Sequence, residues 1–207
     1  MDIWVYDKTF KGFLSLVFDC YELKTFPEKI TGKADAQPSV FHSNYEVFTD
    51  ESKAKRVWNG LRKKISDNSC EMLFHAFLSE LPDIELLILR YIKNVFDSPV
   101  NVEMNFGNKD TLQMLKIARK VGREAQRIPM FVRFQKTADG IYYASHDPRY
   151  DVLPLVIKHF ERRFADQKWI IYDTRRNYGF YYDLQKTSEV TFTESHTNPL
   201  TGAIDKS

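Results

Sequence analysis

The fold class is decided by residues 110–136, which read DTLQMLKIARKVGREAQRIPMFVRFQK. Before Pro129 the apolar residues recur at the spacing of an amphipathic helix, and after it they alternate with polar residues as in a strand. Because proline lacks a backbone N–H, we expect a helix capped by Asp110 to run until Pro129. A strand is expected at 130–136, so the chain changes from helical to strand-forming here.

Upstream of this stretch the patterns are mainly helical. Short strands are expected at residues 3–6 and 40–48, with a surface loop rich in Lys, Gly, Asp and Pro at 27–38. Polar caps and a first-turn proline are expected to begin three of the helices. These residues are Thr9, Asp50 and Pro82.

Downstream of residue 136 short strands dominate. A strand at 141–145 is expected to form a hairpin with 130–136, because Gly140 supplies the positive φ of a tight turn. A helix at 151–164, a second hairpin and a last strand follow, the strands being expected at 169–173, 179–184 and 190–193.

We therefore predict an α+β fold, with the helical first two thirds packed against a mainly antiparallel sheet formed largely by the C-terminal third. We expect one domain, residues 1–195, and a flexible C-terminal tail, residues 196–207.

Composition places the chain among globular proteins, with 43% hydrophobic and 28% charged residues. The formal net charge is only +2, so attraction to nucleic acid has to come from a local cluster of cations. Cys20 and Cys70 form no CxxC pair and are expected to be reduced structural thiols. The N-terminus does not resemble a signal peptide, and charges interrupt the most apolar window, residues 84–95. We expect a cytoplasmic protein without membrane contact.

The helix expected at 110–127 carries cations along one face. At about 100° per residue, four of them fall within roughly 60° of one another, with Arg119 at the margin. They are Lys116, Lys120, Arg123 and Arg127. A charged face opposite an apolar one is typical of any amphipathic helix, but a merely solvated face usually mixes both signs and this one has only Glu124 nearby. A phosphate backbone would suit such a face.

Further cations extend this candidate nucleic-acid surface. Arg133 is expected on the strand that follows the helix, and Arg162 on the helix at 151–164. Arg175 and Arg176 are expected at the tip of the second hairpin, beside several aromatic residues. Rings beside guanidinium groups are typical of a platform for unpaired bases, although Tyr and Phe also favour hairpins for packing alone.

Motifs for catalysis and cofactor binding are absent from the sequence. The five histidines are scattered without metal-ligand spacing, and no phosphate-binding or dinucleotide-binding loop is present, so we predict no metal and no cofactor. Glu124, Asp173 and His159 are the candidates for acid or base chemistry, and Asp7 is a further candidate. A helix cap, a helix ion pair or a turn former is the more common role of such a carboxylate.

Several motifs together resemble a bacterial family of unknown function that is described as a probable DNA metabolism protein. They are Tyr6-Asp7-Lys8-Thr9-Phe10 with Gly12-Phe13-Leu14, Arg119-Lys120-Val121-Gly122-Arg123-Glu124-Ala125, Phe131-Val132-Arg133-Phe134, Asp139-Gly140-Ile141-Tyr142-Tyr143, Leu153-Pro154-Leu155 with His159-Phe160 and Arg163-Phe164, and Trp169-Ile170-Ile171-Tyr172-Asp173.

Members of that family occur beside a radical-SAM protein assigned to DNA modification or repair, or fused to a uracil-DNA-glycosylase-like domain. The resemblance implies a role linked to DNA and a partner of one of these two kinds, and no known reaction. The 207 residues contain no glycosylase segment and no cluster-binding cysteine triad, so the partner would be a separate protein.

Three hypotheses follow. The first is an accessory protein of DNA repair or modification that binds nucleic acid and presents it to such a partner. The second is an enzyme acting on DNA, which should bring two titratable groups together in a cleft. The third is a protein-interaction module, which should show an apolar patch near the arginines.

Overall fold

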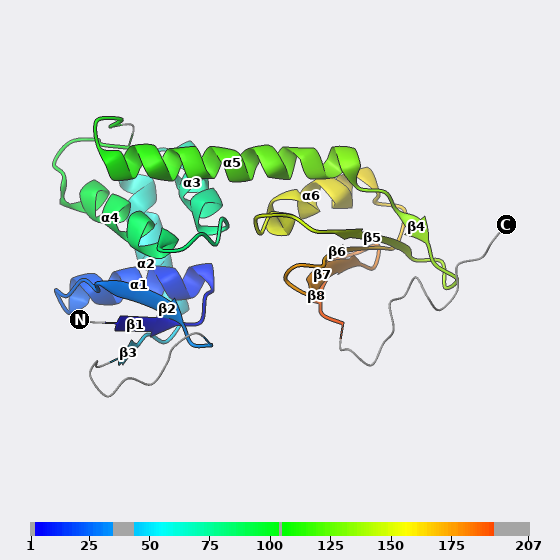
Figure 1. Cartoon of the computed structure of the whole chain (residues 1–207), viewed down its shortest axis with the longest axis horizontal. Helices are drawn as coiled ribbons and strands as arrows, with labels where there is room; N and C mark the ends of the chain where they lie inside the picture. Colours follow the sequence, from blue (N-terminus) through cyan, green and yellow to red (C-terminus); the bar gives the residue numbers. More distant parts are fainter. Residues whose placement is uncertain (1–2, 35–43, 104, 193–207) are drawn as a thin grey trace. The chain divides into compact units, whose positions relative to one another are not determined.

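The computed structural model describes residues 3–34, 44–103 and 105–192, and Figure 1 shows the course of the chain. The chain divides into two compact units, Met1–Lys120 and Val121–Ser207. One helix, α5 (Lys109–Phe131), crosses the boundary between them. The single domain expected at 1–195 stays a prediction. The tail expected at 196–207 lies outside the described residues.

The first unit contains a three-stranded parallel sheet. Strand β1 (Ile3–Tyr6) lies between β2 (Lys29–Gly32) and β3 (Asn44–Glu46). The expected first strand is confirmed. The prediction of a loop at 27–38 was wrong for residues 29–32, which form β2. Strand β2 has a single buried apolar residue, Ile30. The sequence therefore lacks the alternation of apolar and polar residues that would have predicted a strand, and the strand forms by backbone pairing with β1. Of the strand expected at 40–48, residues 44–46 form β3, and 40–43 lie outside the described residues.

Four helices precede α5 in the described part of the first unit: α1 (Phe10–Glu22), α2 (Glu51–Lys64), α3 (Asp67–Phe77) and α4 (Ile84–Asp97). Two expected caps are confirmed. The Thr9 side chain accepts a hydrogen bond from the Gly12 amide, and Asp50 accepts from the amides of Ser52 and Lys53. The expected start of a helix at Pro82 was wrong, because the preceding turn continues through Asp83, whose φ is 58°.

The core of the first unit is formed where these helices bury their apolar faces. Phe13, Leu61, Leu73 and Ile88 are fully buried in it. Helix α5 adds three residues to the same core, namely Met114, Leu115 and Ala118. The rotation of α5 about its own axis is fixed by this burial.

Both ends of α5 differ from expectation. Its cap is Asn108, whose side chain accepts hydrogen bonds from the amides of Asp110 and Thr111, while Asp110 itself pairs with Arg90. Pro129 lies inside the helix, and the Val132 amide still donates to the Ile128 carbonyl at 3.0 Å. A proline removes its own N–H but does not prevent later residues from bonding. The strand expected at 130–136 is therefore reduced to β4 (Gln135–Lys136).

The second unit contains a five-stranded mixed sheet in the order β4-β5-β6-β7-β8. Its other strands are β5 (Tyr142–His146), β6 (Trp169–Asp173), β7 (Tyr178–Tyr182) and β8 (Thr187–Val190). Helix α6 (Leu153–Arg163) connects the parallel pair β5 and β6, and every other pairing is antiparallel. Both expected hairpins are confirmed, and Gly140 has the positive φ, 83°. The last strand lies earlier than the expected 190–193.

The α+β class is confirmed: the helices lie mostly in the N-terminal part of the chain, and the C-terminal sheet is mainly antiparallel. The core of the second unit is rich in aromatic rings, with Phe160 of α6 lying 6.1 Å from Trp169 and Trp169 lying 5.3 Å from Tyr182, centroid to centroid. Within the described residues, no helix is both long and apolar enough to cross a membrane.

Replacing Gly179 with alanine is expected to destabilise the protein. A Cβ at this position would lie 2.4 Å from the Ile171 carbonyl oxygen and 2.9 Å from the Tyr172 Cα, and backbone atoms inside a sheet cannot move away easily. We expect Gly179→Ala to lower the free energy of unfolding by about 1–3 kcal/mol. Urea denaturation of the full chain measures this. Gly107→Ala is the control, because its Cβ would meet only a side-chain atom, Asn105 Oδ1, at 3.2 Å. Equal losses in both variants would contradict the prediction.

Candidate nucleic-acid interface

A row of cations occupies the solvent face of α5. We name Lys116, Lys120, Arg123 and Arg127 the basic stripe; all four are exposed. The opposite face of the helix is buried, including Met114, Val121 and Ile128. Along the axis the stripe extends roughly 17 Å, at about 1.5 Å per residue. In the described part of the chain no carboxylate forms an ion pair with any of its members.

Further cations on α5 add to the positive charge of the basic stripe. Lys109 and Arg119 are exposed as well. Glu124 is half-buried, and its Oε1 accepts a hydrogen bond from the Arg149 amide at 2.7 Å. The acid that the sequence placed nearest to these cations therefore binds the backbone of another segment.

Arg133 closes the C-terminal end of α5. It lies after the helix and outside any strand, so its expected position on a strand was wrong. Its guanidinium donates to the carbonyls of Met130 and Val132 at 2.9 and 3.0 Å. These acceptors belong to the negative end of the helix dipole, so the Arg133 charge stabilises the helix end. Arg162 is exposed on α6, and its role as a nucleic-acid contact stays a prediction.

Arg175 and Arg176 lie in the turn between β6 and β7, and both form ion pairs there. Arg175 pairs with Asp147 at 2.9 Å, where both side chains are well exposed. Arg176 pairs with Asp173 at 2.8 Å, and the Asp173 side chain is completely buried. Because the parallel strands β5 and β6 end at the same edge of the sheet, the segment after β5 and the turn after β6 meet. A nearby carboxylate thus offsets each of these two charges.

Glu124 and Asp173 belong to one hydrogen-bond network. Arg176 donates to the carbonyls of Pro148 and Arg149, while the Arg149 amide donates to Glu124. Asp173 also accepts from the amides of Arg175 and Arg176. Both carboxylates accept hydrogen bonds from backbone amides and so stabilise the fold.

His159 lies apart from this network. It is exposed on α6, where its ring meets that of Phe160 edge-on. In the described residues, no hydrogen bond joins His159 to Glu124 or Asp173. The three acid–base candidates are therefore not assembled around a common point by hydrogen bonds.

Tyr178 has a hydrogen-bond partner that the sequence did not reveal. Its hydroxyl donates to Asp151 Oδ1, and burial together with the nearby Asp151 carboxylate raises the pKa of Tyr178. Tyr178, Phe180 and Tyr181 are half-buried and Tyr182 is buried. The rings around the turn are thus largely engaged in the fold, and a hydroxyl-to-carboxylate contact across 27 residues leaves no periodic signal that could have predicted it.

Asp7 is anchored by hydrogen bonds at the end of β1. Burial acts to raise the pKa of the Asp7 carboxyl, but hydrogen bonds from Thr49 and Thr9 outweigh it and the pKa lies below its usual range. The Thr49 hydroxyl donates at 2.5 Å, and the Thr9 hydroxyl and amide donate at 2.7 and 2.9 Å. An ionised, fully engaged carboxylate of this kind is typical of a structural anchor.

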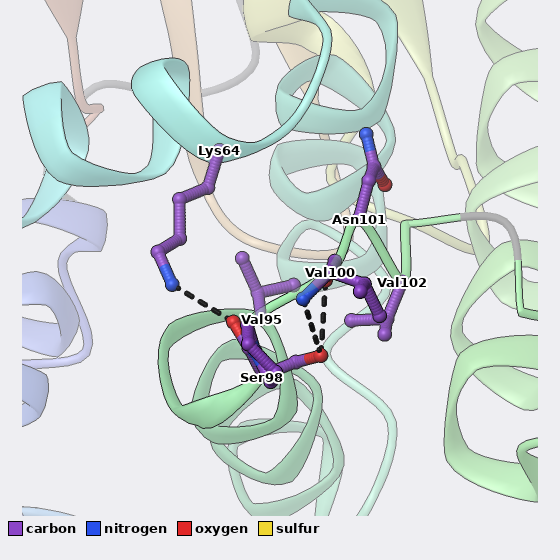
Figure 2. Close-up of a pocket in the computed structure, with 7 residues that line it drawn as sticks. Lys64, Val95, Ser98, Val100, Asn101 and Val102 are labelled. Atoms are coloured by element: carbon purple, nitrogen blue, oxygen red, sulfur yellow. Dashed lines mark hydrogen bonds between the residues drawn. The ribbon is translucent and has the colours of Figure 1, made fainter.

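Two pockets lie among the described residues of the first unit. Figure 2 shows a pocket of about 200 Å³ in which Lys64 Nζ donates to the Ser98 carbonyl, at 3.1 Å, and Ser98 bonds with Val100. Lys64 also donates to the Phe96 carbonyl at 2.8 Å, so this ammonium caps the C-terminal end of α4. The other pocket, of about 540 Å³, is lined by Phe18, Tyr21 and neighbouring residues of α1, α2 and α4. No group of three or more metal-ligating side chains occurs among the residues described.

A model of the family described as Domain of unknown function (DUF4130) matches residues 82–198. The chain belongs to this family. The DUF4130 match covers α4, the whole of α5 and the described strands of the second unit, and so it includes the basic stripe. It does not include the motif around Asp7. A search of curated proteins finds no match to the chain.

The two ion pairs at the end of β6 allow an internal comparison. Asp173→Ala would remove a completely buried carboxylate that pairs with Arg176 and also accepts hydrogen bonds from the amides of Arg175 and Arg176. We expect a loss of about 1–3 kcal/mol in the free energy of unfolding, measured by urea denaturation, because donors in the turn after β6 would lose their buried acceptor. Asp147→Ala breaks the exposed pair with Arg175 and should cost far less, since solvent screens it. A larger loss in Asp147→Ala would refute this assignment.

Proposed function

We propose that this DUF4130 protein binds nucleic acid through the basic stripe of α5. The observation that carries the proposal is a row of four exposed cations on one helix face that no acid of the described chain neutralises. Lys116 and Lys120 are four residues apart, as are Arg123 and Arg127, so like charges repel along the row. A polyanion would relieve this repulsion.

A phosphate backbone fits the basic stripe physically. Lys and Arg contacts to phosphates release condensed counterions, which favours binding without reading sequence. The net charge of +2 makes the local arrangement the source of any such attraction. Arg175 and Arg176 are offset by Asp147 and Asp173, so we assign them a smaller share than the stripe.

The biological setting of the proposal rests on the family resemblance. We infer an accessory protein in DNA repair or modification that presents DNA to a radical-SAM or glycosylase-type partner. The enzyme hypothesis has less support, because Glu124 and Asp173 are committed to backbone hydrogen bonds and His159 is separate from them. One observation favours the protein-interaction module as a second candidate: Met130 and Phe131 are exposed close to Arg127.

The salt dependence of DNA affinity tests the proposed function. We expect Lys116→Ala/Lys120→Ala to weaken binding of single-stranded and duplex DNA. The slope of log K against log salt should fall in magnitude by about 1.4 for single strands and about 1.8 for duplex, corresponding to two lost phosphate contacts. Fluorescence anisotropy over a salt series, with the full chain, measures both quantities. Arg123→Ala/Arg127→Ala should behave in the same way.

A matched control separates the stripe from general charge loss. Lys55→Ala/Lys63→Ala removes the same two charges from exposed positions of α2, and its slope should match that of the wild type. The proposed function fails if the wild type does not bind DNA at moderate salt, or if the stripe and control variants lose affinity equally.

A further inference from the structure

Two large apolar side chains are exposed at consecutive positions at the C-terminal end of α5. Met130 and Phe131 are each 66% exposed. The other large exposed hydrophobic residues in the described chain, such as Phe48 and Phe106, are not adjacent to one another in sequence. Isolated exposed apolar residues need no explanation, but a neighbouring pair beside a functional surface does.

Helix geometry places this pair on the face of the basic stripe. At about 100° per residue, Met130 lies about 50° to one side of the centre of the stripe and Phe131 about 50° to the other. The two side chains thus flank the line that the cations follow, about one turn beyond Arg127. The exposed apolar surface and the exposed charge form one continuous strip along α5.

The position of Phe131 is held by structure on both sides. Ile128, one turn earlier, is buried and anchors the helix, and the Arg133 guanidinium closes the helix end by donating to Met130 and Val132. Within the described residues, no aromatic ring or cation packs on the Phe131 ring. Its faces are therefore available to a ligand without rearrangement of the helix.

We propose that Phe131, with Met130 beside it, stacks on an unpaired base of a single-stranded nucleic acid whose phosphates lie along the basic stripe. This inference rests on the proposed function and specifies its ligand. Successive cations with an exposed ring at the end are the elements of single-strand recognition, in which bases stack on rings and cations follow the backbone. Bases within a duplex are already stacked on each other and offer no free face. Because most of the strip is positively charged, it favours a polyanion as ligand over an apolar protein surface.

The test compares oligothymidylate with an abasic strand of the same length. Phe131→Ala should weaken binding of oligothymidylate by about tenfold, which lies within the range for losing one stacked base. On the abasic strand, wild type and Phe131→Ala should bind equally, because no base is present to stack. Phe131→Trp should retain affinity for oligothymidylate, and its added indole fluorescence should be quenched on binding.

The control is Phe48→Ala, which removes a ring of similar exposure from the first unit and should leave affinity unchanged. The inference is overturned if Phe131→Ala binds oligothymidylate like the wild type, or if it weakens both strands equally. If Lys116→Ala/Lys120→Ala still lowers the salt slope in that case, the stripe binds phosphates, the proposed function stands, and the apolar pair becomes a protein contact. Absence of DNA binding by the wild type overturns both proposals.

Discussion

The burial of one face of α5 is the constraint on which the candidate interface depends. Met114 and Leu115 lie in the core of the first unit, and Val121 and Ile128 are buried further along the same helix. With the apolar face fixed, the helix cannot rotate, and every side chain on the opposite face has to meet solvent. The cations of the basic stripe are held close together in this way despite repelling one another at four-residue spacing.

The arginines of this protein have different roles, and the role of each depends on the groups that lie around it. Arg176 is mostly buried against Asp173 and binds two carbonyls of the segment after β5, so it organises the fold. Arg133 closes a helix end. Arg123 and Arg127 are exposed to solvent. The chemistry of the guanidinium is the same throughout, and the difference lies in which acceptors the chain brings within reach.

Local sequence patterns predicted the structure correctly at several positions where the physical cause is itself local. Thr9 and Asp50 cap helices because their side chains bond amides two or three residues ahead. Gly140 turns a hairpin because only a short segment decides its φ. The predictions for β2 and for the helix end at Pro129 were wrong for different reasons. β2 has a single buried apolar side chain and is set by pairing with β1, which lies far from it in sequence. At Pro129 the proline signal was given too much weight, because a proline removes only its own N–H, and the Val132 amide and Arg133 still bond to the last turn.

The amino-acid sequence alone determined the α+β class, the helical period of residues 110–127 and the clustering of Lys116, Lys120, Arg123 and Arg127 on one face, because each follows from spacing along the chain. Tertiary structure alone decided which of the charged residues remain available. Asp173 pairs with Arg176 three residues later in the chain, and the fold decides that the Asp173 carboxylate is buried there. Asp147 pairs with Arg175 only because the parallel strands β5 and β6 end at one edge of the sheet. Glu124 is directed to Arg149 by contact between segments 25 residues apart. Such pairings depend on distance in space, and no period in the sequence encodes it.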